Sequence, residues 1–457
     1  MPCRSFLPLL ATLSLLAACD SGPTNPDQEA PRSLAAIKES GKLVVLTRNA
    51  PTTWYIGRDG EPRGPEYDMA RAFADHLGVE AEFEVLPSLG AILSALEDGE
   101  GDLAAAGLTP TDGRNERFRF GPAYNHVTQQ VVCRRDTARP RDVADLADLD
   151  LTVVANSSYA ERLRALREDG HPELSWRESE ELSTERLLHE VWKREIDCTV
   201  ADSTIVDINR RYYPELIAPF NLSRKQPLAW ALPAASAELE DAVADWLQSF
   251  RAEGHLDQIH EKYYGFFEVF DYVDTRAFIR RIDERFPQYR SYFRAAAEKH
   301  DLPYTLIAAQ GYQESHWRAE ARSPTGVRGI MMLTRRTARA LGVDDRLDPR
   351  QSIFGGAKYL AQLKERFSEE VTEPDRTWLA LAAYNVGRAH LHDAQQLARR
   401  LGKSPHRWRS MKEILPLLAD PDYYRNLRYG YARGIEPVRY VRRIREYRHV
   451  LHNMMED

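Results

Sequence analysis

The sequence has few cysteines, no excess of charge of one sign, and only one long hydrophobic run. Its 457 residues include 4 cysteines, and 62 lysines and arginines stand against 69 acidic residues, giving a formal net charge of −7. We therefore expect neither a nucleic-acid-binding protein nor an acidic disordered chain. After the first twenty residues no stretch is long and apolar enough to span a bilayer. The length exceeds what one hydrophobic core usually organises, which predicts two or three domains.

The one hydrophobic run lies at the N-terminus and has the composition of an export signal. Arg4 precedes an apolar stretch from Phe6 to Leu16, and small residues follow up to Cys19. This order predicts a signal peptide over residues 1–18. The segment Leu16-Ala17-Ala18-Cys19 resembles the lipobox of bacterial lipoproteins, which implies a lipid on Cys19. An ordinary signal peptide with a chance cysteine is the alternative.

Lipidation implies a periplasmic protein of a Gram-negative bacterium that is anchored in a membrane, with the outer membrane favoured over the inner. Residues 19–35 are rich in Ser, Gly, Pro, Asn, Asp and Gln, a composition that cannot build a core and predicts a flexible tether. Of the remaining cysteines, Cys133 and Cys198 form either a disulfide or two buried free thiols. The sequence leaves both states open.

Two different patterns divide the rest of the chain. Between residues 36 and 268, strand-like runs such as Leu43 to Thr47 alternate with helical patterns such as Tyr67 to Leu77, which predicts a two-lobed α/β domain with a mostly parallel sheet. Between residues 269 and 457 the β runs disappear and helical patterns predominate. The clearest of these are Thr275 to Arg281, Tyr289 to His300, Tyr304 to Glu314, Ile353 to Arg366 and Thr377 to Asn385.

Three segments of the front half resemble the extracellular solute-binding proteins that capture amino acids. They are Lys42 to Leu46, Gly107 to Arg114, and Phe120 to Tyr124, in the order that this family shows. The resemblance implies a bilobal periplasmic-binding-protein-like domain over residues 36–268. The chain departs from the family at Asp112-Gly113, where Pro-Glu is usual, and this difference bears on the shape of the ligand loop.

The same resemblance implies a ligand site for an amino acid or a muropeptide. Arg114 would clamp a carboxylate with its planar fork, Thr109 would add a hydrogen bond, and Asp202 would receive an ammonium group. Ser158 would lie where a helix N-terminus offers N–H groups, and Trp54 would form an aromatic wall.

The alternative for this front site is purely structural. In that case Arg114 pairs with the neighbouring Glu116, and Asp202 only caps a turn.

A carboxyl group at the end of an apolar helical face is the strongest chemical signal of the back half. In the helix predicted around residues 304–314, Ile307, Gly311 and Glu314 recur at helical spacing on one side. A carboxyl group there is partly desolvated, which raises its pKa and keeps it protonated for acid catalysis. The alternative is a surface glutamate at a helix end.

Four segments around this glutamate resemble the lytic transglycosylases with a goose-lysozyme-like fold. They are Glu314-Ser315, Gly329 to Thr334, Ala383 to Gly387, and Arg439 to Val441, in that order, with Ile330 where leucine is usual. The resemblance implies a mainly α-helical lysozyme-like domain that acts on peptidoglycan glycan strands. Glu314 would protonate the oxygen between MurNAc and GlcNAc and then accept the C6 hydroxyl proton, leaving a 1,6-anhydro end.

The resemblance also assigns supporting roles. Ser315 would orient Glu314, Tyr440 would hydrogen-bond near it, and Tyr384 and Asn385 would line the sugar cleft. Met331 and Met332 are either the floor of that cleft or ordinary core residues. No cofactor is implied.

The sequence suggests no metal site either. The nearest histidine pair, His390 and His392, has no third ligand nearby and suits a solvated helix face.

The competing interpretation is a non-catalytic periplasmic protein that binds a solute or peptidoglycan. The intact Glu314-Ser315 and Ala383-Tyr384-Asn385 segments argue against it. A receptor-like domain in the same chain as a wall-cutting enzyme suggests either ligand-dependent regulation or simple targeting.

Overall fold

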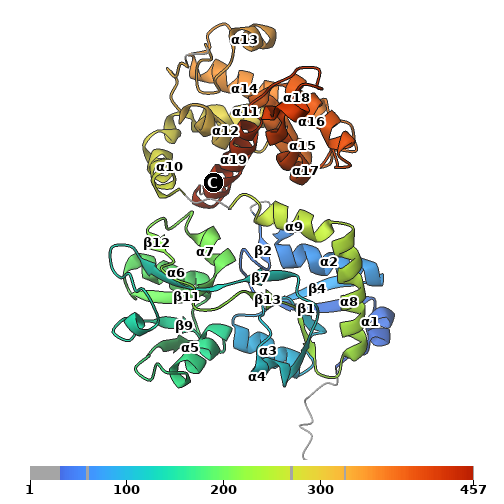
Figure 1. The fold of residues 1–457 in the computed structure, drawn as a ribbon, viewed down its shortest axis with the longest axis vertical. Coiled ribbons are helices and arrows are strands. Elements are labelled where there is room, and N and C mark those ends of the chain that lie inside the picture. Colours follow the sequence, from blue (N-terminus) through green and yellow to red (C-terminus); the bar gives the residue numbers. More distant parts are fainter. Residues whose placement is uncertain (1–30, 58–60, 268–270, 324–325, 456–457) are drawn as a thin grey trace, which may run out of the picture.

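The computed structural model describes residues 31–57, 61–267, 271–323 and 326–455, which form two domains along the long axis of the molecule (Figure 1). The signal peptide, Cys19 and the expected domain boundary at residues 268 and 269 lie outside the described residues. Within the described ranges, no helix combines the length and the apolar character needed to cross a membrane. A bilobal α/β domain is followed by a mainly α-helical one, which confirms the expected fold class.

Lobe 1 of the front domain is built on a five-stranded sheet with the strand order β4-β1-β5-β14-β6. Its strands are β1 (Lys42–Thr47), β4 (Glu80–Val85), β5 (Leu103–Ala104), β6 (Phe118–Phe120) and β14 (Ala231–Pro233), with a separate hairpin of β2 (Tyr55–Ile56) and β3 (Pro62–Arg63). β1 runs parallel to β4 and β5, but β14 runs antiparallel to β5 and β6. Four of the five strands therefore run in one direction, which confirms the expectation of a mostly parallel sheet for this lobe. β14 alone is reversed, because it belongs to the segment that returns from the other lobe.

Helices cover this sheet, and the first of them begins before the predicted domain start. They are α1 (Leu34–Ser40), α2 (Pro65–Leu77), α3 (Leu89–Glu97), α4 (Asp112–Asn115), α8 (Ala237–Ala252) and α9 (His255–Tyr263). Ser33 caps α1 by accepting a hydrogen bond from the backbone N–H of Ala36. The helix thus includes the last two residues of the predicted tether, and Ser33 before them caps it.

Lobe 2 contains a three-stranded antiparallel sheet and a parallel strand pair. Its elements are β8 (Gln129–Arg134), β9 (Thr152–Val154), β10 (Arg177–Ser179), β11 (Cys198–Asp202), β12 (Leu216–Ile217), α5 (Ser158–Glu168), α6 (Thr184–Lys193) and α7 (Ser203–Asn209). Cys133 and Cys198 lie opposite each other on β8 and β11 and form a disulfide, which answers the question that the sequence left open. The short strands β7 (Asn125–Val127) and β13 (Gln226–Leu228) pair where the chain passes between the lobes.

The back domain is a bundle around two antiparallel helices, α12 and α19. Its helices are α10 (Tyr272–Glu284), α11 (Arg290–His300), α12 (Tyr304–Ser315), α13 (Arg335–Leu341), α14 (Pro349–Glu365), α15 (Asp375–Val386), α16 (Arg388–Arg400), α17 (Trp408–Ile414), α18 (Pro421–Tyr424) and α19 (Ile435–Met454). Tyr304 at the start of α12 contacts Met455 just after α19. Tyr312 packs on Tyr447 with ring centroids 4.7 Å apart. The end of α12 therefore lies near the start of α19.

Candidate active site and ligand cleft

Glu314 lies in the last turn of α12 and faces the first third of α19. The Tyr440 hydroxyl on α19 donates a hydrogen bond to Glu314 Oε1 at 2.5 Å. Gln310, one turn earlier on α12, donates from Nε2 to the Tyr440 oxygen at 3.2 Å. Because Gln310 supplies a proton to that oxygen, the single hydroxyl proton of Tyr440 is directed to Glu314.

The surroundings of Glu314 favour its neutral form. The side chain is half-buried, but protein atoms enclose its carboxyl group, and this burial raises its pKa to about 8. The hydrogen bond from Tyr440 acts in the opposite direction and only partly offsets the burial. Glu314 is therefore mostly protonated at neutral pH, the state that a general acid needs.

The backbone directly after Glu314 adopts an unusual left-handed turn. His316 has a φ of 53° and Trp317 a φ of 55°, which are uncommon for residues with side chains. Trp317 is fully buried, and its indole N–H donates to the Ala308 carbonyl at 2.9 Å. Ser315 Oγ donates to the Gly311 carbonyl at 3.1 Å and accepts from the Arg318 N–H at 3.2 Å. Ser315 and Trp317 thus hold the turn that fixes the end of α12.

A second tight segment packs against the site. Gly329 has a φ of 82°, and a Cβ there would lie 1.8 Å from the Arg346 carbonyl oxygen, so only glycine fits. Met331 is fully buried, and its carbonyl accepts a hydrogen bond from the Tyr384 hydroxyl at 2.8 Å. Met332 is half-buried with a φ of 46°. Met331 thus occupies a core position, whereas Met332 keeps some exposure.

Tyr384 and Asn385 lie in the last turn of α15, and Tyr384 lies near Glu314. Burial raises the pKa of Tyr384 well above its usual value, and the nearby Glu314 contributes in the same direction. Tyr384 is half-buried and Asn385 is exposed. The structure therefore gathers Glu314, Tyr440 and Tyr384, whereas the contacts of Ser315 serve the helix end.

Gln310 is a member of this cluster that we did not expect from the sequence. It is fully buried, and among the described residues its Oε1 has no hydrogen-bond partner. The signal was present, because Gln310 lies one turn before Glu314 and next to Gly311 on the otherwise apolar face of α12. A polar side chain in such a position is a candidate for holding a functional group.

The described part of the chain contains no group of three or more His, Cys, Asp or Glu side chains arranged to hold a metal ion.

The front domain has a small cleft between its lobes. It is lined by Arg48, Thr52, Gly107, Tyr124, Asp202, Thr204, Ile205, Leu228 and Tyr264. Arg48 from the end of β1 forms an ion pair with Glu185 of α6 at 3.4 Å, which links the two lobes. Of the five residues expected to bind ligand, Asp202 is among the lining residues.

Two acidic side chains beside this cleft have pKa values raised close to neutral pH. Burial raises the pKa of Asp202 to about 7, and burial likewise raises the pKa of Glu66 to about 7. Tyr124 donates a hydrogen bond to Glu66, and the Gly107 N–H donates to the same carboxylate at 2.9 Å. Asp202 is the residue before α7 but makes no capping bond with its side chain, so the cap alternative does not describe it.

The other expected ligand residues lie around the cleft with protein partners. Arg114 donates to the Thr109 carbonyl at 2.9 Å and to the Asn156 carbonyl in the other lobe at 3.0 Å. Its ion-pair partner is Glu161 at 3.6 Å rather than Glu116. Within the described residues, Thr109 Oγ1 has no hydrogen-bond partner.

Ser158 and Trp54 complete the set. Ser158 Oγ, at the start of α5, accepts a hydrogen bond from Gln129 Nε2 at 3.1 Å. Trp54 is half-buried and is not among the lining residues, where Tyr124 and Tyr264 supply the aromatic surface.

Sequence reasoning missed Arg48, Glu66 and Tyr264. Glu66 carries a detectable signal, because it lies on the helical face of α2 that buries Met69 and Phe73. A carboxylate on such a face indicates a functional position. For Arg48 and Tyr264 we find no comparable signal, since their neighbours come from distant segments.

Comparison with known families divides the chain in the same two parts. Residues 42–266 match the family described as bacterial extracellular solute-binding proteins, family 3. Residues 291–406 match the transglycosylase SLT domain.

Several proteins are similar over nearly the whole chain. "Membrane-bound lytic murein transglycosylase F 2" of Alkalilimnicola ehrlichii is 48% identical, over 99% of this chain and 100% of the relative. "Membrane-bound lytic murein transglycosylase F" of Maricaulis maris is 50% identical, over 98% of both chains.

Solved structures similar to this chain cover about half of it. The crystal structure of an ancestral amino acid-binding protein, AncCDT-1, is 25% identical over 50% of this chain and 98% of its own, with a TM-score of 0.44. The amino acid transporter substrate-binding protein AbpA of Streptococcus pneumoniae, bound to L-arginine, is 26% identical over 50% and 98%, with a TM-score of 0.45.

The raised pKa of Glu314 predicts a pH-dependent gain in stability for Glu314→Gln. The folded protein holds this proton up to about pH 8, whereas the unfolded chain releases it near 4.5, the ordinary pKa of a glutamate. Between these values the folded state binds more protons, so its stability falls as pH rises. We expect Glu314→Gln to melt at a higher temperature than the wild type at pH 8 and at a similar temperature at pH 4.

Thermal unfolding of both proteins between pH 4 and 9 measures this difference. Glu320→Gln is the matched control, because Glu320 is an exposed glutamate six residues away. A melting-temperature difference for Glu314→Gln that stays constant with pH would contradict the prediction.

Proposed function

Since the chain belongs to the family of membrane-bound lytic murein transglycosylases F, we propose that Glu314 carries out its reaction. The protein is a peptidoglycan lytic transglycosylase. The observation that supports Glu314 is its enclosed carboxyl group. Burial raises the pKa of this group to about 8, and Tyr440 holds it by a hydrogen bond. Such a group is protonated at neutral pH and has a fixed direction.

The proposed reaction uses this one carboxyl group twice. Glu314 first gives its proton to the oxygen that links MurNAc to GlcNAc, so that the C–O bond at the MurNAc anomeric carbon breaks. The resulting carboxylate then takes the proton of the MurNAc C6 hydroxyl, whose oxygen bonds to the anomeric carbon. The products are a free GlcNAc end and a 1,6-anhydro-MurNAc end, and Glu314 regains its proton.

The neighbours of Glu314 have three different roles in this proposal. Tyr440 holds the carboxyl group, and Gln310 orients the Tyr440 hydroxyl. Tyr384, Asn385 and Met332 border the space for the sugars. Ser315 acts indirectly, through the turn that ends α12.

Glu314→Gln tests this assignment, because the amide has nearly the same shape but cannot donate the catalytic proton. We expect binding to sacculi to persist and release of 1,6-anhydromuropeptides to fall by at least about 100-fold, within the range for loss of a general acid. Mass spectrometry of digested sacculi measures the products. Glu320→Gln should keep wild-type activity, and near wild-type release by Glu314→Gln would refute the role.

A non-catalytic binding protein is not favoured. The chain matches the transglycosylase domain and keeps an enclosed glutamate in the expected position. Such a carboxyl group is costly to bury without a function.

The protein is periplasmic and membrane-associated, like the relatives whose names describe them as membrane-bound. We further propose that a lipid on Cys19 provides the anchor and that the outer membrane holds it. The support is the sequence Leu16-Ala17-Ala18-Cys19 after an apolar run.

Cys19→Ala should release the processed protein into the soluble fraction, because no other hydrophobic anchor is expected in the tether. Ultracentrifugation after a high-salt wash measures the release, and density separation of the two membranes identifies the one that holds the wild type. Cys133→Ala with Cys198→Ala is the control, which should stay with the membrane. A processed Cys19→Ala protein that still sediments would refute the lipid anchor.

The front cleft has the chemistry to bind a small zwitterionic ligand, an amino acid or a muropeptide. Arg48 can meet a carboxylate, and Asp202 can meet an ammonium group. Asp202 Oδ1, Glu66 Oε2 and Thr109 Oγ1 are buried and have no hydrogen-bond partner within the described residues. A polar ligand would satisfy such atoms.

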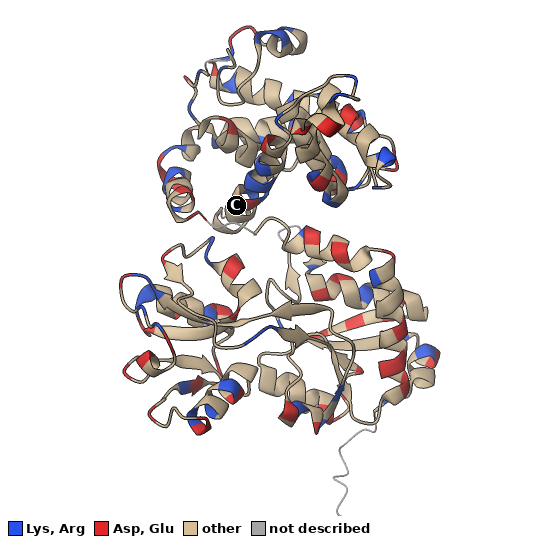
Figure 2. Ribbon diagram, in the orientation of Figure 1, with Lys and Arg blue, Asp and Glu red and all other residues tan. Residues whose placement is uncertain are grey.

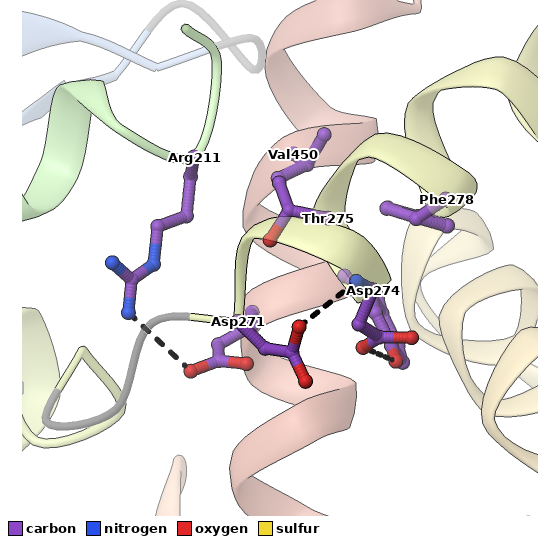
Figure 3. A pocket seen from close by; sticks show the side chains of 8 residues that line it. Arg211, Asp271, Asp274, Thr275, Phe278 and Val450 are labelled. Carbon is purple, nitrogen blue, oxygen red and sulfur yellow. Dashed lines mark hydrogen bonds and ion pairs between the residues drawn. The ribbon is translucent and has the colours of Figure 1, made fainter. Parts of the chain in front are cut away.

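A single helix links this cleft to Glu314. In its second half, α19 contacts both lobes of the front domain, and Figure 1 places its C-terminal end at the junction of the domains. Arg445 binds Glu261 of α9 in lobe 1, and Glu446 pairs at 3.5 Å with Arg211, which follows α7 in lobe 2. Figure 3 shows Arg211 reaching into the junction with α10 and α19. The same helix carries Tyr440.

Both contacts lie close to the cleft along the chain. Tyr264, three residues after Glu261, lines the cleft, and so does Ile205 on α7, ahead of Arg211. A ligand that changes the angle between the lobes would therefore move two contacts of α19 relative to each other. Such a ligand alters activity only if it binds the two states with different affinity.

We expect soluble muropeptides to change the rate of sacculus digestion by roughly 5- to 150-fold, the usual size of such coupling. Wild type and Arg114→Ala are compared with and without muropeptides. Glu261→Gln should bind muropeptides but lose the rate change, and Glu253→Gln, an exposed glutamate of the same lobe, is its control. Equal rates in all conditions, with binding seen by calorimetry, would leave the front domain a targeting role only.

A further inference from the structure

An exposed aromatic surface lies between α18 and α19. Of the eight large hydrophobic side chains that are exposed in the described residues, three fall within residues 429–435. Tyr429 is 45% exposed, Tyr431 56% and Ile435 42%. Such clustering on a protein surface marks a site of interaction rather than chance. We call Tyr429 and Tyr431 the tyrosine platform.

The platform is anchored to the domain at several points. The Tyr429 N–H donates to the buried carboxylate of Asp393 at 2.7 Å. The Ala432 N–H donates to the Leu418 carbonyl at 3.0 Å. At Gly434 a Cβ would lie 1.6 Å from the Leu415 carbonyl oxygen, so the chain passes directly over this backbone. The two rings are therefore presented by a fixed segment, as a preformed binding surface requires.

Two paths connect the platform with the cleft of Glu314. Along the chain, α19 begins at Ile435, and Tyr440 follows five residues later, about 7.5 Å further along the helix. Across the surface, the Tyr429 ring lies against His390 of α16, with centroids 6.4 Å apart. α16 begins three residues after Asn385, which is exposed and which we propose to border the space for the sugars. Figure 1 shows α16 and α18 beside the start of α19.

Arginines and acidic residues alternate around the platform. Arg425 and Arg428 follow Asp422 in the chain, and Arg433 forms an ion pair with Glu436 at 3.2 Å. Arg428 lies over the Tyr429 ring at 5.4 Å from its centroid. An aromatic face packs against the C–H face of a sugar ring, and arginine suits carboxylates such as those on the peptide stems of peptidoglycan. A glycan strand with its stems matches both features.

We propose that Tyr429 and Tyr431 form an outer binding site for the glycan strand, where sugars distant from the scissile bond stack on the rings. Arg428 contacts a carboxylate of a peptide stem there. The inference rests on the proposed function, because it takes the same glycan strand as the occupant. The platform binds substrate but takes no part in proton transfer at Glu314.

The test compares a long and a short substrate. Tyr429→Ala with Tyr431→Ala should weaken binding to sacculi about tenfold, as expected for loss of partly buried aromatic contacts. Co-sedimentation measures this binding in the Glu314→Gln background, where no cutting occurs. In the active protein, kcat/KM for a tetrasaccharide should fall less than sacculus binding does, because a tetrasaccharide offers fewer sugars to the platform than a long strand.

Two control variants separate stacking from folding. Replacing both tyrosines by phenylalanine keeps the rings and should keep sacculus binding. Val273→Ala removes another exposed apolar side chain, 74% exposed on α10, and should have no effect. Thermal unfolding checks that each variant folds.

Arg428 is tested with glycan strands from which an amidase has removed the peptides. Arg428→Gln should weaken binding to intact sacculi but not to the stripped strands. Unchanged sacculus binding by the double-alanine variant would overturn the proposal, as would an equal loss on sacculi and the tetrasaccharide. Failure of the proposed function is distinguishable, because the wild type would then release no 1,6-anhydro product although binding still depended on the tyrosines.

Discussion

A carboxyl group enclosed by protein loses the hydration that favours its charged form, and the packing of α12 against α19 imposes this condition on Glu314. Burial raises the pKa of Glu314 to about 8, and the hydrogen bond from Tyr440 keeps the group in one orientation. The turn at His316 and Trp317 ends α12 at this point. The cost of that turn is borne by the burial of Trp317 in the core of the domain.

The same helix meets two opposite requirements along its length. Near Tyr440, α19 is packed in the bundle, where an aromatic hydroxyl supplies a single hydrogen bond to the site. In its second half it faces the front domain, and Figure 2 shows Lys and Arg gathered on this part of it. Arg445 is buried there but satisfied by Glu261, and it also lies over the Trp378 ring at 5.0 Å. Buried charges of this kind need partners, so the domain junction tolerates little sliding.

Sequence patterns predicted the parts of this protein that depend on local spacing. The helix of Glu314 was expected at residues 304–314 and spans Tyr304–Ser315, because its apolar positions repeat with helical period. The order of the lobes and the helical character of the back domain followed from the same kind of signal. The direction of β14 did not, since an extended run has the same composition in a parallel and an antiparallel pair. Gln310 and Arg48 act through partners that the spacing does not show.

In the front cleft, resemblance to a family identified candidate ligand residues such as Asp202 but did not predict which groups the side chain of Arg114 contacts. Arg114 was expected to meet a ligand carboxylate, but here its fork holds the carbonyls of Thr109 and Asn156, one from each lobe. These bonds and the Arg48–Glu185 pair connect the two lobes across the cleft. Asp202 remains buried with a pKa raised to about 7, which an ammonium group beside it would lower. A cationic group bound beside Asp202 would therefore stabilise its charged form and offset the unfavourable burial of this carboxyl group. A ligand enclosed by both lobes would benefit most from this interaction.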